Sequence, residues 1–156
     1  MTDTPTLTYW HVYTDDAGYS TQARAQLSAF AKQSMGGDAD PQFNLHLGDE
    51  RVHVMFAELP ADWVGEWHEN PRPQWILPLS GGWWVETQDG RRVEMCAGEL
   101  SFGADQGTTA DAEGRKGHRS GSLDGAPCKM MIVQLLDDKW VGARPEDLQR
   151  AADQAE

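Results

Sequence analysis

The hydrophobic pattern divides the chain into a short front segment and a longer segment in which apolar residues recur with a period of two. Residues 7–13 are aromatic and β-branched, which predicts a strand that ends at the turn residues Asp15–Gly18. After Ser20, apolar residues recur at helical spacing: Ala23, Leu27, Phe30 and Ala31. The glycine pair at 36–37 is a stop signal for a helix. The pattern therefore predicts a strand followed by a packing helix.

From residue 41 onward the period changes to two, which is typical of strands. Residues 43–47 and 52–56 alternate apolar and polar side chains, and Gly48-Asp49 between them predicts a hairpin. Further strands are predicted at 63–68, 74–80, 82–87, 91–95, 99–103, 118–120 and 129–136. Strands this short and closely spaced indicate an antiparallel sandwich or barrel. The long loop 104–117 interrupts them, and residues 145–152 predict a terminal surface helix with a proline in its first turn.

Composition limits the class of protein. The 156 residues suffice for one domain, and 25 acidic against 13 basic residues give a net charge of −12. This charge argues against nucleic acid or an anionic membrane surface as a partner. No apolar run approaches the ~20 residues of a membrane helix, and the first residues lack the features of a secretory signal. We therefore expect a cytoplasmic protein, in which Cys96 and Cys128 are reduced thiols.

One stretch carries candidate chemistry at a recognisable spacing. His68, Asn70, Gln74 and Gly81 are spaced like the first motif of the cupin superfamily, in which the second position is histidine and the third glutamate. Residues 96–99, followed by His118, resemble the second cupin motif. Similarity to small single-domain bacterial cupins extends to further positions: Trp67, Pro71, Arg72, Leu79, Thr108, Thr109, Lys116, Gly117, Ile132 and Gln134.

The resemblance covers residues 43–136 and implies a fold. It predicts an all-β, single-domain cupin β-barrel of jelly-roll type, with a small-molecule pocket at the barrel centre. The front segment 1–42 is then a strand and helix that pack on the barrel, and residues 137–156 are a tail with a short helix. Function follows less directly from such a fold, because the superfamily includes oxygenases, isomerases, lyases and plain ligand binders.

Metal binding is the first question that the resemblance raises. In metal-binding cupins, three histidines and a glutamate at these positions hold a divalent ion such as iron, manganese, zinc or nickel. Here the resemblance implies His68, His118 and Gln74 as metal ligands, but an amide oxygen is a poorer ligand than a carboxylate. Three alternatives stay open, namely a tightly held metal, a weak one completed by substrate, and a metal-free pocket. In the last, His68 or His118 acts as general acid or base, unless both are only core residues.

Four residues are candidates for substrate binding. Asn70 shares a strand face with His68 because side chains at i and i+2 point the same way. Arg72 lies between two prolines at the expected barrel mouth, where it either clamps an anionic group or forms a structural ion pair. Trp84 is assigned to the cavity wall, since only one of two adjacent tryptophans on a strand can face it. His53 faces either the interior or the outer surface.

The remaining polar and aromatic residues carry weaker predictions. His11 and His46 are expected at the periphery, and Asp105 and Lys116 are interpreted as solvated loop charges in preference to lid contacts. Five of the seven tryptophans fall between residues 63 and 84. Aromatic side chains on the outside of a small barrel favour a homodimer, with simple core packing as the alternative.

The sequence thus favours a small-molecule pocket over any other functional site. We expect an enzyme of small-molecule metabolism, in which a divalent metal or a histidine pair supplies the chemistry and His68 and His118 are the catalytic residues. A non-catalytic or metal-free binding or sensing protein is the alternative.

Overall fold

The computed structural model describes residues 3–155, whose regular secondary structure is mostly β-strand. Its strands are β1 Leu7–Thr14, β2 Ser20–Leu27, β3 Ala31–Gln33, β4 Gln42–Asn44, β5 Val52–Leu59, β6 Gln74–Ser80, β7 Gly82–Thr87, β8 Arg92–Cys96, β9 Ser101–Ala104, β10 His118–Ser122 and β11 Cys128–Leu135. A short 3-10 helix, Asp138–Trp140, precedes the helix α1, Pro145–Gln154. The strands predicted at 74–80 and 82–87 are confirmed to the residue.

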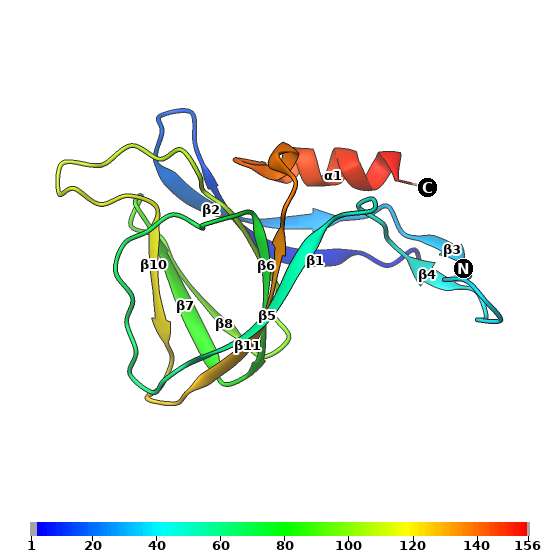
Figure 1. The fold of residues 1–156 in the computed structure, drawn as a ribbon, viewed down its shortest axis with the longest axis horizontal. Helices are drawn as coiled ribbons and strands as arrows, with labels where there is room; N and C mark the ends of the chain where they lie inside the picture. The colour runs from blue at the N-terminus through cyan, green and yellow to red at the C-terminus, as the bar shows by residue number, and fades with distance from the viewer. Residues whose placement is uncertain (1–2, 156) are drawn as a thin grey trace.

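Two facing sheets form the body of the molecule. The larger has the order β2-β1-β9-β6-β11-β5, with one parallel pair, β1 and β9. The smaller, β10-β7-β8, is antiparallel and stands opposite β6 and β11 (Figure 1). The described residues therefore form an open sandwich, and the closed barrel of the prediction is not found among them.

The predicted N-terminal helix is wrong, because residues 20–27 form β2 and pair with β1 along its whole length. The turn before β2 is tight: the Asp15 carboxylate accepts hydrogen bonds from the backbone N–H groups of Ala17 and Tyr19, at 2.9 and 3.0 Å. Of its fully buried residues, Ser20, Gln22 and Leu27, the first two are polar. Their side chains bond to backbone carbonyls of Gly117, Val85 and Arg91. A search for apolar periodicity therefore misses this strand.

The predicted hairpin around Gly48-Asp49 is also wrong. β4 pairs with β3 in a small separate ribbon, while β5 pairs with β11 over eight residues. Leu45 and Leu47 instead pack against the outer apolar cluster described below. The predicted strand at 63–68 is reduced to two isolated bridges to β10, Val64 with Gly121 and His68 with His118.

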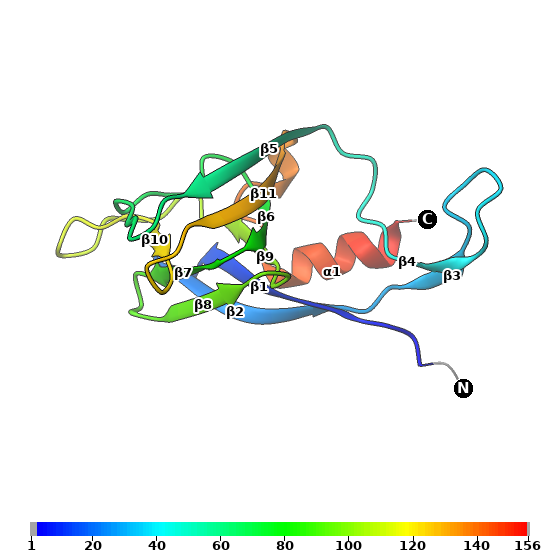
Figure 2. The ribbon, with the colours of Figure 1, turned by 90° about the horizontal axis from the view of Figure 1, so that it is seen from below.

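Two apolar clusters stabilise this arrangement from opposite sides of the large sheet. The inner cluster lies between the sheets: Val12, Ile76, Trp83, Val85, Val93, Met95, Cys128 and Met130. The outer cluster joins β1, β2 and β9 to the C-terminal segment, where Leu148 and Ala152 of α1 are buried. Figure 2 shows α1 lying along this part of the sheet. The predicted C-terminal helix is therefore confirmed, and it has a packing role.

Two further predictions concern the membrane and the cysteines. In the described part of the chain, no helix is long and apolar enough to cross a membrane. Cys96 is exposed and Cys128 is buried, and both are free thiols, as predicted.

Candidate functional site

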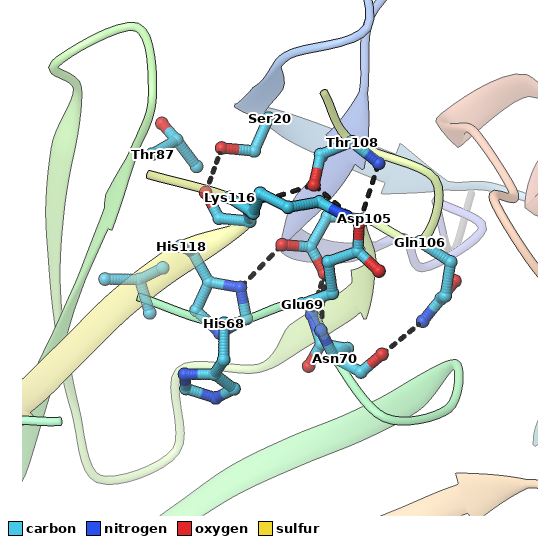
Figure 3. Close-up of polar contacts among 12 residues, drawn as sticks. Ser20, His68, Glu69, Asn70, Thr87, Asp105, Gln106, Thr108, Lys116 and His118 are labelled. Atoms are coloured by element: carbon cyan, nitrogen blue, oxygen red, sulfur yellow. Dashed lines mark hydrogen bonds and ion pairs between the residues drawn. The ribbon is translucent and has the colours of Figure 1, made fainter. Parts of the chain in front are cut away.

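His68 and His118 come together because their backbones pair. Each backbone N–H donates to the carbonyl of the other residue, at 2.8 and 2.9 Å, and the ring centres are 4.7 Å apart. Gly117 permits this approach: its φ is +68°, and a Cβ there would collide with the His68 backbone. Segment 60–73, which carries His68, and β10, which carries His118, thus deliver two imidazoles to one place (Figure 3).

His118 is held by a buried carboxylate. Its Nδ1 lies 2.6 Å from Oδ2 of Asp105, which directly follows β9 and is completely buried. Burial alone would raise the pKa of Asp105, but the charge of His118 and hydrogen bonds from His118 and Asn70 outweigh it and hold that pKa below its ordinary value. An ionised carboxylate only accepts hydrogen bonds, so Nδ1 of His118 carries a proton. When the ring is neutral, Nε2 is the free acceptor, and when the ring takes up a second proton there, Asp105 balances its charge.

A row of side-chain amides continues from Asp105 across the sheet. Asn70 donates to Asp105 Oδ1 from its backbone N–H at 2.8 Å and its Nδ2 at 2.7 Å. Gln74 donates to Asn70 at 2.8 Å, and Gln134 donates to Gln74 at 3.0 Å. Gly103 makes room for this row, because a Cβ there would collide with the Asn70 amide. We call Gln134, Gln74, Asn70 and Asp105 the amide relay.

His68 has the same tautomer for a different reason. Its Nδ1 lies 2.7 Å from the backbone carbonyl of Glu66, and a carbonyl can only accept a hydrogen bond. Nδ1 is therefore the donor, and Nε2 of the neutral ring bears the lone pair. Within residues 3–155, no hydrogen bond reaches Nε2 of His68 or of His118.

Both imidazoles line a cavity of about 140 Å³ between the two sheets. The other lining residues are mostly apolar: Leu59, Trp63, Gln74, Ile76, Trp83, Ser120, Met130 and Ile132. Trp83 is buried, and its indole Nε1 has no hydrogen-bond partner among the described residues. The cavity is thus an apolar pocket with a cluster of polar groups at one end.

The loop 105–117 is held firmly beside this end of the pocket. Glu69 Oε1 accepts hydrogen bonds from the backbone N–H and the hydroxyl of Thr108, at 2.8 and 2.6 Å, and lies 3.9 Å from Lys116 Nζ (Figure 3). The Thr108 hydroxyl in turn accepts from Gly117 N–H at 3.0 Å. These bonds tie the loop to the segment that carries His68.

The structure brings together some of the predicted site residues and separates others. His68, Gln74 and His118 line the pocket, and Asn70 lies behind it in the amide relay. Arg72 and His53 are exposed and do not line it.

The adjacent tryptophans take the reverse of the predicted assignment. Trp83 faces the pocket, whereas Trp84 packs under the Arg92 guanidinium, 4.1 Å from the ring centre. Both rings are buried, so neither forms an exposed aromatic surface. Exposed apolar residues gather instead on β5, where Phe56 is 71% exposed. The homodimer stays a prediction.

Sequence reasoning missed the two ends of the amide relay, Asp105 and Gln134. Asp105 was interpreted as a solvated charge, yet no side chain of the site is more deeply buried. One signal was present: it directly follows the buried strand β9, so an acid there has little access to water. Gln134 is one of the positions of similarity to small cupins, but its role was hidden because its partner is Gln74, 60 residues earlier.

The residues present do not make a complete metal site. Among residues 3–155, no group of three His, Cys, Asp or Glu side chains is placed to hold a metal ion. Both ends of the Gln74 amide are already hydrogen-bonded, and Asp105 is occupied by His118 and Asn70. Two neutral imidazoles without a carboxylate do not fit a tightly held dication. The metal implied by the resemblance stays a prediction.

Comparisons with known proteins give cupin-domain structures. No protein-family model and no curated protein matches the sequence. Solved structures similar to this chain include a cupin-2 domain protein from Shewanella frigidimarina (17% identity, 54% of this chain and 70% of that one, TM-score 0.39) and a cupin-domain protein from Bordetella pertussis (15%, 60% and 91%, 0.41). Another is the polyketide cyclase RemF from Streptomyces resistomycificus (17%, 70% and 77%, 0.44). At these scores the likenesses say nothing about activity.

Proposed function

We propose that this chain binds a small molecule between its sheets and transfers a proton to or from it. One observation carries the proposal: both Nδ1 atoms are held by acceptors, which leaves the two Nε2 lone pairs of His68 and His118 without a partner at the pocket. A buried histidine normally satisfies both nitrogens, and His118 is buried, so its unpartnered Nε2 orients it as a base. His68 is exposed at the pocket, and its Nε2 also meets solvent.

His118 is the general base of this proposal. Its Nε2 takes a proton from carbon or oxygen of the bound molecule, and the positive charge that develops on the ring is stabilised by Asp105 at Nδ1. The electron pair of the broken C–H or O–H bond stays on the ligand, and a proton returns from His118 or His68. Asp105 is a positioning residue, since it acts only through His118.

A ketone that carries a hydroxyl on the neighbouring carbon tests this proposal. In D₂O, His118 removes the proton at the hydroxyl-bearing carbon of 2-hydroxycyclohexanone, an enediolate forms, and deuterium is added back. Proton NMR measures the loss of that signal. We expect exchange in the wild type, none above background in His118→Asn, and a loss on the order of 10²-fold or more in Asp105→Asn. His46→Asn changes an exposed histidine outside the site and keeps the wild-type rate.

Two results of this experiment decide between the alternatives. Exchange that chelation removes and manganese, iron or zinc restores would replace the acid–base proposal by the metal-dependent one. Binding of the ketone without exchange would leave a binding or sensing protein, as in the alternative from the sequence. Wild-type exchange in His118→Asn contradicts the assigned base.

A further inference from the structure

The volume of the pocket limits its ligand to about one ring. The cavity measures about 140 Å³, and an engineered protein cavity of about 150 Å³ lined by apolar residues binds benzene. Drug-sized ligands need cavities of roughly 300–1,000 Å³. Because the pocket is open on the side of the exposed His68, the second ring of a fused two-ring molecule would extend toward solvent.

The wall of the pocket selects an apolar body. Leu59 of β5, Ile76 of β6, and Met130 and Ile132 of β11 contribute aliphatic surface, and Trp63 and Trp83 contribute aromatic surface. Burial of a ring against such a wall gains roughly 25 cal/mol per Å² of apolar area. Polar groups are confined to His68, Gln74, His118 and Ser120.

The hydrogen-bonding groups select a hydroxyl. Nε2 of His68 and Nε2 of His118 are acceptors in the neutral rings, so the ligand group that meets them must donate. The hydroxyl of Ser120, which also lines the pocket, can donate to an acceptor on the ligand. A hydroxyl is the smallest group that both donates and accepts.

Charge excludes an anionic ligand. None of the lining residues is a lysine or arginine, and Arg72, for which an anion clamp was one of two predicted roles, is exposed elsewhere. The carboxylate of Asp105 lies directly behind His118 and repels negative charge. A carboxylate or phosphate on the ligand would lose its hydration in the pocket without gaining a fixed cation.

We infer that the pocket binds an uncharged molecule of one ring that bears a hydroxyl, of the phenol or cyclic alcohol class. The inference rests on the proposed small-molecule site and gives the substrate class for it. It requires no catalysis, so it can be tested by binding alone.

Phenol is the direct probe, with three analogues that each change one property. Toluene lacks the hydroxyl, benzoate adds a negative charge, and 2-naphthol adds a ring. Titration of the ¹⁵N-labelled full chain follows the indole N–H resonance of Trp83, assigned with Trp83→Phe. We expect phenol to shift this resonance saturably, and toluene and benzoate to bind at least tenfold more weakly. We expect 2-naphthol, whose second ring would not be buried by the pocket wall, to bind more weakly than phenol.

Neighbouring residues on β11 provide a matched pair of variants. Ile132 lines the pocket and Val133, the next residue, lies outside its lining, so Ile132→Phe fills the cavity and Val133→Phe does not. We expect a tenfold or greater loss of phenol binding in the first variant only. Leu59→Phe, from β5, is a second filling variant if Ile132→Phe fails to fold.

The outcomes separate this inference from the proposed function. Benzoate or 2-naphthol binding as tightly as phenol overturns the inference, and so does equal loss of phenol binding in both β11 variants. Phenol bound with the expected selectivity but no exchange of 2-hydroxycyclohexanone supports the ligand class and contradicts the acid–base proposal. Exchange of 2-hydroxycyclohexanone without selective binding of phenol supports the acid–base proposal and contradicts the ligand class.

Discussion

The two buried histidines His11 and His118 lie on opposite sides of the large sheet and differ in how many of their ring nitrogens have a hydrogen-bond partner. His11 of β1 packs against Tyr9 and Phe102 of the outer cluster and is completely buried. Its Nε2 donates to the Ala143 carbonyl at 2.7 Å, and its Nδ1 accepts from the Tyr9 hydroxyl at 3.3 Å. His118 is 5% exposed, and only its Nδ1 is engaged. The two neutral rings therefore have opposite tautomers.

The comparison shows that burial does not distinguish a structural histidine from a functional one. Burial lowers the pKa of His11 to about 4, despite the Ala143 carbonyl and the charge of Asp147, so this ring is neutral at physiological pH. His118 faces a carboxylate instead, which can stabilise a positive charge on the ring. What separates them is whether the second nitrogen has a partner in the protein.

Removal of the counter-charge should produce the largest effect on stability. Asp105→Ala leaves His118 and both Asn70 donors without their acceptor in a buried place. We expect a loss of about 3–5 kcal/mol in the free energy of unfolding, measured by urea denaturation. Asp49→Ala, at an exposed position, should cost less than about 0.5 kcal/mol. A cost below about 1 kcal/mol for Asp105→Ala would mean that the carboxylate is not a buried partner.

The lowered pKa of His11 predicts how stability depends on pH. In the unfolded chain this histidine titrates near pH 6.5, and in the folded chain its pKa is about 4. Between these pH values the unfolded state binds more protons than the folded state. The contribution of neutral His11 to the free energy of unfolding is therefore fully present above pH 6.5 and decreases as the pH falls toward 4. The total loss is about 3 kcal/mol.

A variant isolates this contribution. His11→Gln keeps a donor for the Ala143 carbonyl and does not titrate, so its urea midpoint should depend less on pH between 6.5 and 4.5 than that of the wild type. His46→Gln, at an exposed position, should retain the wild-type dependence. Asp105 acts in a lower window, because its pKa is depressed and the stability it contributes is lost only as pH falls below the ordinary aspartate range. Parallel curves for wild type and His11→Gln would contradict the burial of His11.

The far end of the amide relay should have the smallest effect. Gln134→Met removes one neutral hydrogen bond to Gln74 while it keeps the shape of the side chain. We expect a loss of about 1 kcal/mol in the free energy of unfolding. Gln26→Met, on the exposed face of β2, is the control and should be near neutral. A loss as large as that of Asp105→Ala would show that the relay acts as a single charged unit.

The fold was predictable where apolar side chains recur with the period of a strand or a helix. The strands at 74–80 and 82–87 and the C-terminal helix were found this way. β2 was not, because Ser20 and Gln22 are buried through hydrogen bonds to distant backbone carbonyls that no local pattern encodes. The pairing of β5 with β11 could not be predicted either, because the paired residues lie about 75 positions apart and no local pattern encodes such a distant partner.

The candidate site was predictable only in part. Spacing placed His68, Gln74 and His118 together, and the pocket contains all three. Asp105 could not be assigned, because its role depends on β9 ending beside His118. Trp84 was chosen over Trp83 because alternation on a strand shows that two residues face opposite ways but not which one faces in.

The tautomers of His118 and His11 test the central claim most directly. Two-dimensional ¹H–¹⁵N NMR at alkaline pH distinguishes a protonated from an unprotonated ring nitrogen, and His118→Asn and His11→Gln assign the signals. We predict that His118 carries its proton on Nδ1, with Nε2 unprotonated and shifted when phenol is added, and that His11 carries its proton on Nε2 and does not respond. A proton on Nε2 of His118 in the neutral ring would contradict the account, because the pocket would then have no base at that position.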